Sequence, residues 1–412
     1  MPFSAGRVKN GAVAVDGVIA PEVVVPDDAQ EAADMLAEAA AQGRAVTPVG
    51  GSTALNLGNP PERVDRVLLT KRLAGIIDYE PTDLVLSVGA GARFGDVQAV
   101  LAEHGQRLPL DPPGAADATI GGLIATGCWG PLRYSAGTLR DLLIGIAVAH
   151  ASGTVSKAGG MVVKNVSGYD MPRLYLGSLG TLGVVVSANF KVLPRPRAEA
   201  TVLAAYDDPA GAFSAASQLR GGREPIAALE VAFMNGGWAL ATRIEGRDET
   251  VDAVAGRIAA NANGDITRLD GQESAGWWSS YVAHQQVAQD DNAVLVRCGG
   301  RPKETAALAT GIAVAMNDLG IAMSYFAASP GLGVVVARLD FGSDGSAERL
   351  AEVQGILLSL ADTATILAAP PSWKRGIDVW GRLPEGFEVM QSLRQQFDPE
   401  RTINPGRFAG FL

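Results

Sequence analysis

The sequence contains few residues of the kinds that form disulfides or bind metals. Only two cysteines, Cys128 and Cys298, and three histidines occur among its 412 residues. Two cysteines so far apart are too few for a disulfide framework, a zinc ribbon or an iron–sulfur cluster held by this chain alone. We therefore expect no metal site in the chain, and we expect any metal-centred electron transfer to take place in another protein.

Long hydrophobic runs and clusters of basic residues are also lacking. No apolar stretch is long enough to span a bilayer, and the first residues show neither a sustained hydrophobic segment nor a cleavage pattern. The formal net charge of -10 opposes binding to nucleic acid and to anionic lipid headgroups. These absences predict a cytoplasmic protein that binds no nucleic acid and does not insert into a membrane, although partners could hold it at the inner face of one.

Glycine is the residue in excess, with 50 occurrences, about twice the usual share. The glycines punctuate short apolar runs, which predicts a fold with many strands and tight turns. Apolar residues at helical spacing predict helices at 29–43 and 94–105, and apolar runs predict strands at 44–49 and 142–151. Prolines and charged residues at 194–200 mark a boundary, beyond which strands alternate with alanine-rich helices. We therefore expect a second domain of the α+β class.

Two glycine-rich segments are also rich in hydroxyl groups: VGGSTALNLG at 49–58 and ATIGGLIATG at 118–127. Because glycine has no Cβ, the main chain of such a segment can approach a diphosphate and hold it by N–H groups. We expect the first segment to hold phosphate groups in this way directly after a strand. We expect the second segment to do so at another strand–loop junction. The residues concerned are Gly50, Gly51, Ser52 and Thr53 in the first segment, and Gly121 and Gly122 in the second.

The glycine content of these segments has a simpler explanation, because both could be tight turns of a strand-rich protein. Neither segment matches G-x-x-x-x-G-K-[ST], and neither matches the G-x-G-x-x-G pattern that leads directly into a helix. A Walker-type ATPase and a plain Rossmann dehydrogenase are therefore disfavoured.

Five motifs in a fixed order carry a resemblance to a known family. They are PVGGSTALNLG at 48–58, the stretch from DYEPTD to LPLDPP at 78–113, ATIGGLIATG at 118–127, VKNVSGYDMPRLYLGSLGTLGVV at 163–185 and FDPERTINPGRF at 397–408. In this order they resemble the FAD-binding domain of the p-cresol methylhydroxylase and vanillyl-alcohol oxidase superfamily. Within that superfamily the chain is most similar to the FAD-binding subunits of bacterial glycolate oxidases.

The resemblance implies an α+β fold with a two-part FAD-binding domain of the p-cresol methylhydroxylase type. It implies a main FAD-binding part at 1–197, an inserted α+β cap or substrate domain at 198–379, and a C-terminal return to the FAD domain at 380–412. By the resemblance, Val49, Gly50, Gly51, Ser52, Thr53 and Ala54 cradle the pyrophosphate; Pro113, Gly114, Ala118, Thr119, Gly121, Gly122, Ala125 and Gly127 line the pyrophosphate and the inner edge of the isoalloxazine; Gly180, Gly183 and Val185 hold the adenosine end; and Asn404 lies near the isoalloxazine.

The chain departs from the family pattern at several points. Members that hold flavin covalently use a histidine in the first glycine loop, or a histidine, cysteine or tyrosine elsewhere, whereas this loop reads GGST. We therefore expect FAD to be bound noncovalently. Leu179 stands where many relatives have glutamate, and the histidine-rich metal motif of the members that oxidise D-2-hydroxy acids is absent.

Few residues are available for the chemistry of substrate oxidation, which needs an anchor for the substrate and a group to accept a proton. Our candidates for catalytic residues are Arg375, Tyr169 and His284; His104 and His150 are expected to be structural. Lys164 and Asn165 match a family motif near the flavin. Cys128 and Trp129 lie close to the expected flavin, but we expect them to be packing residues. Arg297 and Arg338 could clamp a carboxylate, although solvent-facing strand residues are the favoured interpretation for both.

Three functions are compatible with these features. The chain could be the FAD-binding subunit of a heteromeric glycolate oxidase or similar 2-hydroxy-acid dehydrogenase, with a related flavoprotein subunit and an iron–sulfur subunit as partners. It could instead be a stand-alone FAD-dependent oxidase or dehydrogenase of a small alcohol or hydroxy acid. The third possibility is a non-catalytic flavin-binding subunit. The missing histidines disfavour the second possibility, and the retained flavin loops favour the first over the third.

Overall fold

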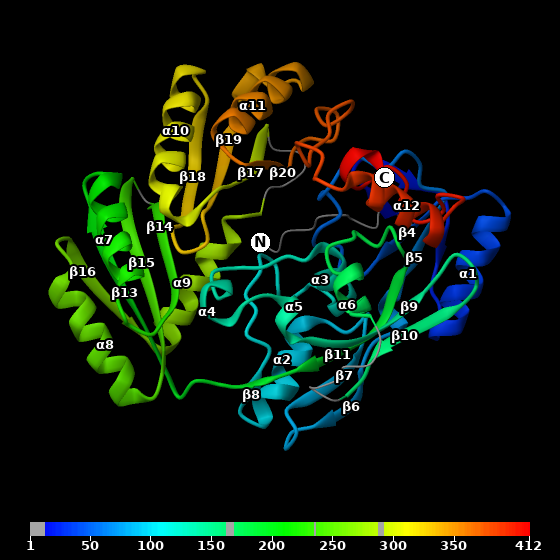
Figure 1. Cartoon of the computed structure of the whole chain (residues 1–412), viewed down its shortest axis with the longest axis horizontal. Helices are drawn as coiled ribbons and strands as arrows, with labels where there is room; N and C mark the ends of the chain where they lie inside the picture. The colour runs from blue at the N-terminus through cyan, green and yellow to red at the C-terminus, as the bar shows by residue number, and fades with distance from the viewer. Residues whose placement is uncertain (1–12, 162–168, 235, 287–291) are drawn as a thin grey trace.

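The computed structural model describes residues 13–161, 169–234, 236–286 and 292–412. Several small sheets form one side of the molecule and a single eight-stranded sheet forms the other (Figure 1). Helices and strands are mixed in both parts, so the expected α+β class is confirmed.

A small parallel sheet near the N-terminus carries the first glycine segment. Its strand order is β3-β5-β4, and β4 ends at the residue before Gly50. Helix α1 begins after Asp28, whose side chain accepts a hydrogen bond from the main-chain N–H of Glu31, as expected for a helix N-cap. The elements of this part are β1 (Val13–Val15), β2 (Val18–Ala20), β3 (Val23–Val24), α1 (Ala29–Ala41), β4 (Val46–Val49), β5 (Arg66–Leu69) and η1 (Thr70–Arg72).

A five-stranded antiparallel sheet follows, in the order β10-β9-β11-β7-β6. One of its faces is covered by buried apolar residues of helices α2 and α3, which form one core with Leu86, Val88 and Phe190 of the strands. Strands β8 and β12 of the same stretch form a separate two-stranded sheet. The elements of this stretch are β6 (Ile76–Glu80), β7 (Val85–Gly89), α2 (Phe94–Glu103), β8 (Gln106–Arg107), α3 (Ile120–Thr126), α4 (Arg133–Ala136), α5 (Leu139–Leu142), β9 (Leu143–Ala149), β10 (Val155–Gly159), α6 (Met171–Tyr175), β11 (Val184–Lys191) and β12 (Leu193–Pro194).

The eight-stranded sheet has the order β16-β13-β15-β14-β18-β19-β17-β20 and antiparallel pairing at every junction between the described strands. Its elements are β13 (Ala198–Tyr206), α7 (Pro209–Gly221), β14 (Ile226–Met234), β15 (Gly237–Gly246), α8 (Asp248–Asn261), β16 (Asp265–Asp270), α9 (Gly271–Ala283), β17 (Ala293–Gly299), η2 (Pro302–Glu304), α10 (Thr305–Asp318), β18 (Ala322–Ser329), β19 (Val334–Asp340), η3 (Gly342–Asp344), α11 (Ala347–Leu360) and β20 (Thr363–Ala368).

The two faces of this sheet differ in what covers them. Helices α7, α8, α10 and α11 pack a large apolar core onto one face. The other face carries small side chains, among them Ala228, Ala241 and Ala327, which pack with Trp278 and Tyr281 of α9. Helix α4, which follows the second glycine segment, contacts β14 of the sheet. Arg243, two residues after Ala241 in β15, lies 3.7 Å from Asp111, so the face with the small side chains meets the first part of the chain.

The last residues of the chain return to the first part. Helix α12 (Phe387–Phe397) and the tail that ends at η4 (Ala409–Phe411) lie beside β4 and β5 in Figure 1. Ile403 forms an isolated parallel β-bridge with Val46, and the main-chain N–H of Asn404 donates a 3.0 Å hydrogen bond to the carbonyl oxygen of Val46. The expected C-terminal return is confirmed.

Several local predictions agree with the structure, and one needs correction. The helices predicted at 29–43 and 94–105 are α1 and α2, and the strands predicted at 44–49 and 142–151 are β4 and β9. The second glycine segment, however, is no strand–loop junction, because residues 120–126 form helix α3. Its two glycines lie in the first helical turn, which the glycine content of the sequence concealed.

We propose the same division of the chain into parts as the sequence suggests, at 1–197, 198–379 and 380–412. Every strand of the eight-stranded sheet lies between residues 198 and 368, and helix α12 lies in the last part.

Candidate functional site

The first glycine segment lies directly against the second. A Cβ on Gly50 would lie 2.0 Å from Oγ1 of Thr119, and a Cβ on Gly51 would lie 2.1 Å from the main-chain oxygen of Asp117. Ser52, the next residue, has a φ of 59°, which is uncommon for a residue other than glycine. The close approach of the two main chains therefore requires glycine at both positions. Val49 is buried at the end of β4, and Thr53 and Ala54 follow the turn as partly exposed residues.

The second segment is held by local hydrogen bonds and by glycine. Thr119 is the N-cap of α3, and its hydroxyl group accepts a 3.3 Å hydrogen bond from the N–H of Gly122. Gly114 has a φ of 68°, and a Cβ there would lie 2.3 Å from Nε2 of Gln286, a residue just after α9. This segment thus touches the second part of the chain as well as the first glycine segment. Pro113 is partly exposed beside Gly114, and Ala118 is buried.

A third segment and the C-terminal tail complete the arrangement. The side-chain amide of Asn404 donates a 2.6 Å hydrogen bond to the carbonyl oxygen of Leu179. Leu179 and Asn404 both have a φ of 50°. A Cβ on Gly180 would lie 3.3 Å from Cγ of Pro48 and 3.6 Å from Nδ2 of Asn404. Residues far apart in sequence, around 50, 117, 180 and 404, therefore meet at one place.

The remaining candidates for cofactor contact have roles within the fold. The N–H of Gly121 donates to the carbonyl oxygen of Ala90, and Gly127 ends α3 with a φ of 61°. The carbonyl oxygen of Ala125 accepts a hydrogen bond from the N–H of Leu179, which joins the second and third segments. Gly183 precedes β11 and Val185 lies within it; a Cβ on Gly183 would lie 2.5 Å from Cγ1 of Val148 in β9. Gly183 and Val185 thus have a packing role in the five-stranded sheet.

A cavity of about 1230 Å³ opens between the two parts of the chain. One wall includes residues 108–112 and 114–117, which precede the second segment, and the other includes residues of β13, β15, β16 and α9. Arg243, Glu199 and Trp278 face the cavity from the eight-stranded sheet and α9, and Asp111 faces it from the first part.

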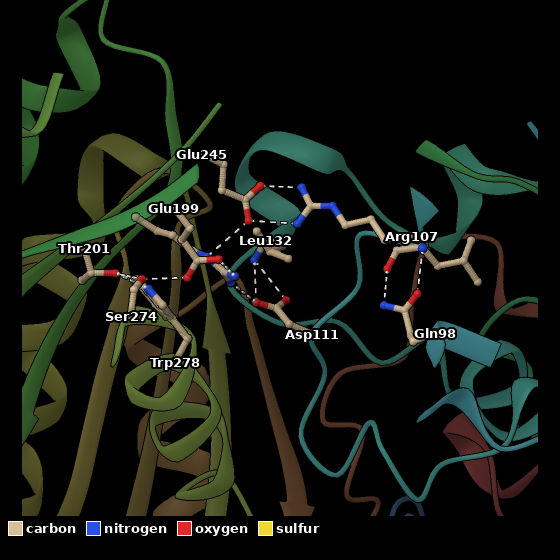
Figure 2. Close-up of polar contacts among 11 residues, drawn as sticks. Gln98, Arg107, Asp111, Leu132, Glu199, Thr201, Glu245, Ser274 and Trp278 are labelled. Carbon is tan, nitrogen blue, oxygen red and sulfur yellow. Dashed lines mark hydrogen bonds and ion pairs between the residues drawn. The ribbon is translucent and has the colours of Figure 1, made fainter. Parts of the chain in front are cut away.

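Charged side chains join the two walls of this cavity (Figure 2). Arg107 donates two hydrogen bonds to the carboxylate of Glu245 across the boundary. Arg243 is 2.7 Å from an oxygen of Glu199, 3.3 Å from one of Glu245 and 3.7 Å from one of Asp111. Such two-point pairs fix orientation as well as distance, so this network sets how the eight-stranded sheet lies against the first part.

Asp111 is the member of this network with an altered acidity. The main-chain N–H of Leu132 donates to both of its oxygens, at 3.0 and 3.2 Å. Burial raises the pKa of Asp111 to about 7, although the charge of Arg243 acts in the opposite direction. Asp111 directly precedes Pro112 and Pro113, and the sequence analysis missed it. The signal available in the sequence was a carboxylate next to a proline pair at the start of a glycine segment.

The three candidates for catalytic residues lie at the surface. The exposed fraction of Tyr169 is 92%, so it has no packing role. His284 follows α9, donates a hydrogen bond from Nδ1 to the carbonyl oxygen of Ser280, and stacks on Tyr325 with ring centres 5.7 Å apart. Arg375 is exposed. In the part of the chain that the structure describes, no contact joins these three residues, and their catalytic role stays a prediction.

Other residues singled out in the sequence have clear surroundings or fall outside the described ranges. Lys164 and Asn165 lie outside the residues that the structure describes. His104 ends α2, and Nε2 of His150 lies 2.7 Å from the hydroxyl oxygen of Ser156. Lys374, next to Arg375, is fully buried; its ammonium group pairs with Asp16 and donates to the carbonyl oxygens of residues 56 and 58 in the first glycine segment.

Metal ligands do not gather in the described ranges: no group of three or more His, Cys, Asp or Glu side chains there is arranged to hold an ion. Within the same ranges, no helix is long and apolar enough to cross a membrane.

Comparison with known proteins agrees with this geometry. Residues 20–159 match the family model of an FAD binding domain. Glycolate oxidase subunit GlcE of Escherichia coli (strain K12) is 44% identical over 125 residues, which are 30% of this chain and 36% of that protein. Glycolate oxidase subunit GlcD of Bacillus subtilis (strain 168) is 33% identical over 186 residues, 45% of this chain and 40% of that protein. A mitochondrial D-lactate dehydrogenase [cytochrome] of Saccharomyces cerevisiae is 30% identical over 201 residues, 48% of this chain and 34% of that protein.

Solved structures extend the likeness of the fold beyond the first part. Two structures of an alkyldihydroxyacetonephosphate synthase superpose on 93% of this chain, with TM-scores of 0.68 and 0.67 and sequence identities of 18% and 16%. The superpositions include 75% and 76% of the synthase chains. Residues 20–159 therefore form an FAD-binding domain, and the fold of most of the chain is that of the two solved structures. The matched part spans only about 34–40% of the length of the three relatives named above.

The residues present fit this cofactor. A Cβ at position 50 or 51 would fill the space where the two glycine segments meet, as expected where a main chain must approach a pyrophosphate. One polar atom at this place, Oδ1 of Asn404, is buried and has no hydrogen-bond partner among the described residues. A buried acceptor of this kind normally has a partner, and a bound dinucleotide can supply it.

Proposed function

We propose that this chain is the FAD-binding subunit of a flavin-dependent enzyme that oxidises a small 2-hydroxy acid. One observation carries the proposal: the segments around residues 50, 117, 180 and 404 meet at one place next to a cavity between the two parts. The similar proteins whose names state a substrate act on glycolate, D-lactate or D-2-hydroxyglutarate, all of them 2-hydroxy acids.

The residues of the chain hold and orient the cofactor noncovalently. Gly50 and Gly51 let the main chain approach the pyrophosphate, and the hydroxyl groups of Ser52 and Thr53 add donors. FAD, when bound, accepts the two electrons and the hydrogen that leave the substrate carbon. Asp111 is placed to hold a proton near neutral pH at the wall of the cavity, because burial raises the pKa of its carboxyl group to about 7.

We further propose that the chain works in a complex, with a related flavoprotein subunit and an iron–sulfur subunit. The low content of histidine and cysteine supports this proposal, because the chain offers few groups of its own for proton transfer or for onward electron transfer. The complex is proposed to be cytoplasmic, and partners could hold it at the inner face of a membrane. A stand-alone enzyme and a non-catalytic flavin-binding subunit are the alternatives.

Anaerobic reduction of the flavin separates these functions. The purified chain with its FAD is mixed with glycolate or D-lactate, alone and after co-expression with the two candidate partners, and the loss of the visible flavin absorbance is followed. We expect slow bleaching by the chain alone and fast bleaching in the complex. Fast turnover by the isolated chain with an artificial electron acceptor would show a stand-alone enzyme, and no bleaching in either sample would leave the non-catalytic subunit.

A further inference from the structure

Two arginines from different parts of the chain meet at one indole ring. The guanidinium carbon of Arg133, in α4, lies 4.3 Å from the ring centre of Trp129, and that of Arg297, in β17, lies 5.6 Å from it. Trp129 follows the second glycine segment by two residues. The sequence favoured a solvent-facing Arg297, but the antiparallel register of β17 turns this side chain toward the first part of the chain.

Both guanidinium groups contact the same indole ring, and neither has an acidic partner among the described residues. In the described part of the chain, neither Arg133 nor Arg297 forms an ion pair, whereas Arg338 on the neighbouring strand pairs with Asp340 at 3.4 Å. Burial lowers the pKa of both groups, and the charge of Arg133 lowers the pKa of Arg297 further. Asp141 acts on Arg133 only at longer range. Two partly buried cations that repel each other require an anion from elsewhere.

We propose that Arg133, Arg297 and Trp129 form a binding site for the carboxylate of a small organic acid. A guanidinium group offers paired N–H donors that match the two oxygens of a carboxylate, and the indole ring holds both guanidinium planes in place. The identification of this acid as the 2-hydroxy-acid substrate rests on the proposed function. Because one arginine comes from each part of the chain, the site is complete only when the eight-stranded sheet lies against the second glycine segment.

Four side chains surround the proposed site. Arg133, Arg297 and Trp129 are all partly buried, and Cys128 interacts electrostatically with Arg297, so the anion lies among four side chains. The site lies beside the segment that is proposed to line the isoalloxazine. A carboxylate held there places the rest of a short acid next to the flavin, as the proposed oxidation needs.

Calorimetric titration of the flavin-loaded protein with oxalate tests the site. Oxalate is a small carboxylate without a hydroxyl group to oxidise, so its binding does not depend on turnover. We expect the affinity for oxalate to fall roughly tenfold or more in Arg297→Gln and in Arg133→Gln, and to fall less in Arg297→Lys, which keeps the charge. Arg301→Gln is the matched control, because Arg301 lies two residues after the same strand and its side chain is 70% exposed; its affinity should be unchanged.

Alkylation of Cys128 gives a second measurement that needs no calorimetric signal. Cys128 is partly exposed, whereas Cys298 is buried and burial raises its pKa to about 12, so only Cys128 should react. The ratio of the alkylation rate with anionic iodoacetate to the rate with neutral iodoacetamide should be higher for Cys128 than for free cysteine. Oxalate should protect Cys128 from alkylation. This preference should disappear in Arg297→Gln and in Arg133→Gln.

The site is refuted if both glutamine variants bind oxalate as the wild type does, or if Cys128 shows no preference for iodoacetate. Tighter binding of inorganic phosphate than of oxalate overturns the carboxylate assignment. If Arg297→Gln does not fold, Arg133→Gln and Arg297→Lys decide. If no 2-hydroxy acid reduces the flavin but oxalate binds through these arginines, the proposed site is retained and the proposed function is contradicted. The reverse result keeps the function and rejects the site.

Discussion

Tyr281 donates a hydrogen bond of 2.8 Å from its hydroxyl group to the carboxyl group of Glu230, inside the eight-stranded sheet. Ser329 donates to the same group at 2.7 Å. The exposed fraction of Glu230 is 2%, and burial raises the pKa of its carboxyl group to about 8, with a smaller contribution from the charge of Asp111. Glu230 therefore holds a proton at neutral pH, which explains how a carboxyl group lies on the alanine-rich face with no basic partner among the described residues.

Replacement of Glu230 by glutamine should change how stability depends on pH. The pKa of this carboxyl group is raised from 4.5 to about 8, so the folded state binds its proton more tightly than the unfolded state does. Its contribution to stability is fully present below pH 4.5 and is lost as the pH rises toward about 8. Glutamine stays neutral at every pH, so Glu230→Gln should gain stability relative to the wild type as the pH rises from 4.5 to about 8, by roughly 3 kcal/mol between pH 6 and pH 9.

Urea unfolding at several pH values measures this difference. Glu385→Gln is a suitable control because Glu385 is exposed, and its unfolding free energy should follow that of the wild type at every pH. A constant difference between the wild type and Glu230→Gln from pH 6 to pH 9 would show that Glu230 is ionised throughout.

A buried ion pair supports the end of the first glycine segment. Nζ of Lys374 lies 2.5 Å from Oδ2 of Asp16, and both side chains are fully buried. Lys374→Met leaves the charge of Asp16 without its partner and removes two hydrogen bonds to the carbonyl oxygens of residues 56 and 58. We expect a loss of about 3–5 kcal/mol of unfolding free energy.

The double variant Asp16→Asn with Lys374→Met should recover much of this loss, because no unpaired buried charge remains. Lys303→Met is the control, since the side chain of Lys303 is 69% exposed, and its stability should be unchanged. A single variant as stable as the wild type would mean that Asp16 is neutral in the folded protein.

The C-terminal tail should be needed for both stability and cofactor binding. Removal of residues 400–412 deletes the bridge to Val46, the hydrogen bond from Asn404 to Leu179, and the bonds from Arg407 to the carbonyl oxygens of Leu55 and Leu57. We expect a lower melting temperature and less bound FAD. Arg401→Gln, which changes only an exposed pair with Glu62 and a bond to the last turn, should have a small effect. Full FAD content in the truncated protein would show that the tail is not part of the cofactor site.

The sequence was informative where one local pattern determines the structure. Helix α1 follows from Asp28 and regularly spaced apolar residues, and β4 follows from the short apolar run before Gly50. Ordered glycine motifs indicated which distant segments come together, because the same motifs occur in a known family. Helix α3 was missed because two glycines in its first turn lower helix propensity, while the Thr119 cap and the packing of Ile120 and Ile124 compensate.

Contacts between the two parts of the chain could not be predicted from local pattern. Arg297 is an alternate residue of a strand, and only the packing of the sheet onto the second segment decides that it meets Trp129. The raised pKa values of Asp111 and Glu230 also result from burial where separate segments of the chain pack together, which a local pattern does not show. Arg375 was chosen for its position alone; it is exposed, while its neighbour Lys374 is buried.

The FAD content of a glycine variant tests the central claim most directly. Gly51→Val places a side chain where the main-chain oxygen of Asp117 leaves no room and where the main chain must approach the pyrophosphate. Gly256→Ala is the control, because Gly256 lies in α8 and an added Cβ there would have no neighbouring atom within 4 Å outside the helix's own backbone. After acid precipitation, the wild type and Gly256→Ala should release stoichiometric FAD into the supernatant, and folded Gly51→Val should release little. Equal FAD from all three proteins, or flavin that stays in the precipitate, would contradict a noncovalent site between the two glycine segments.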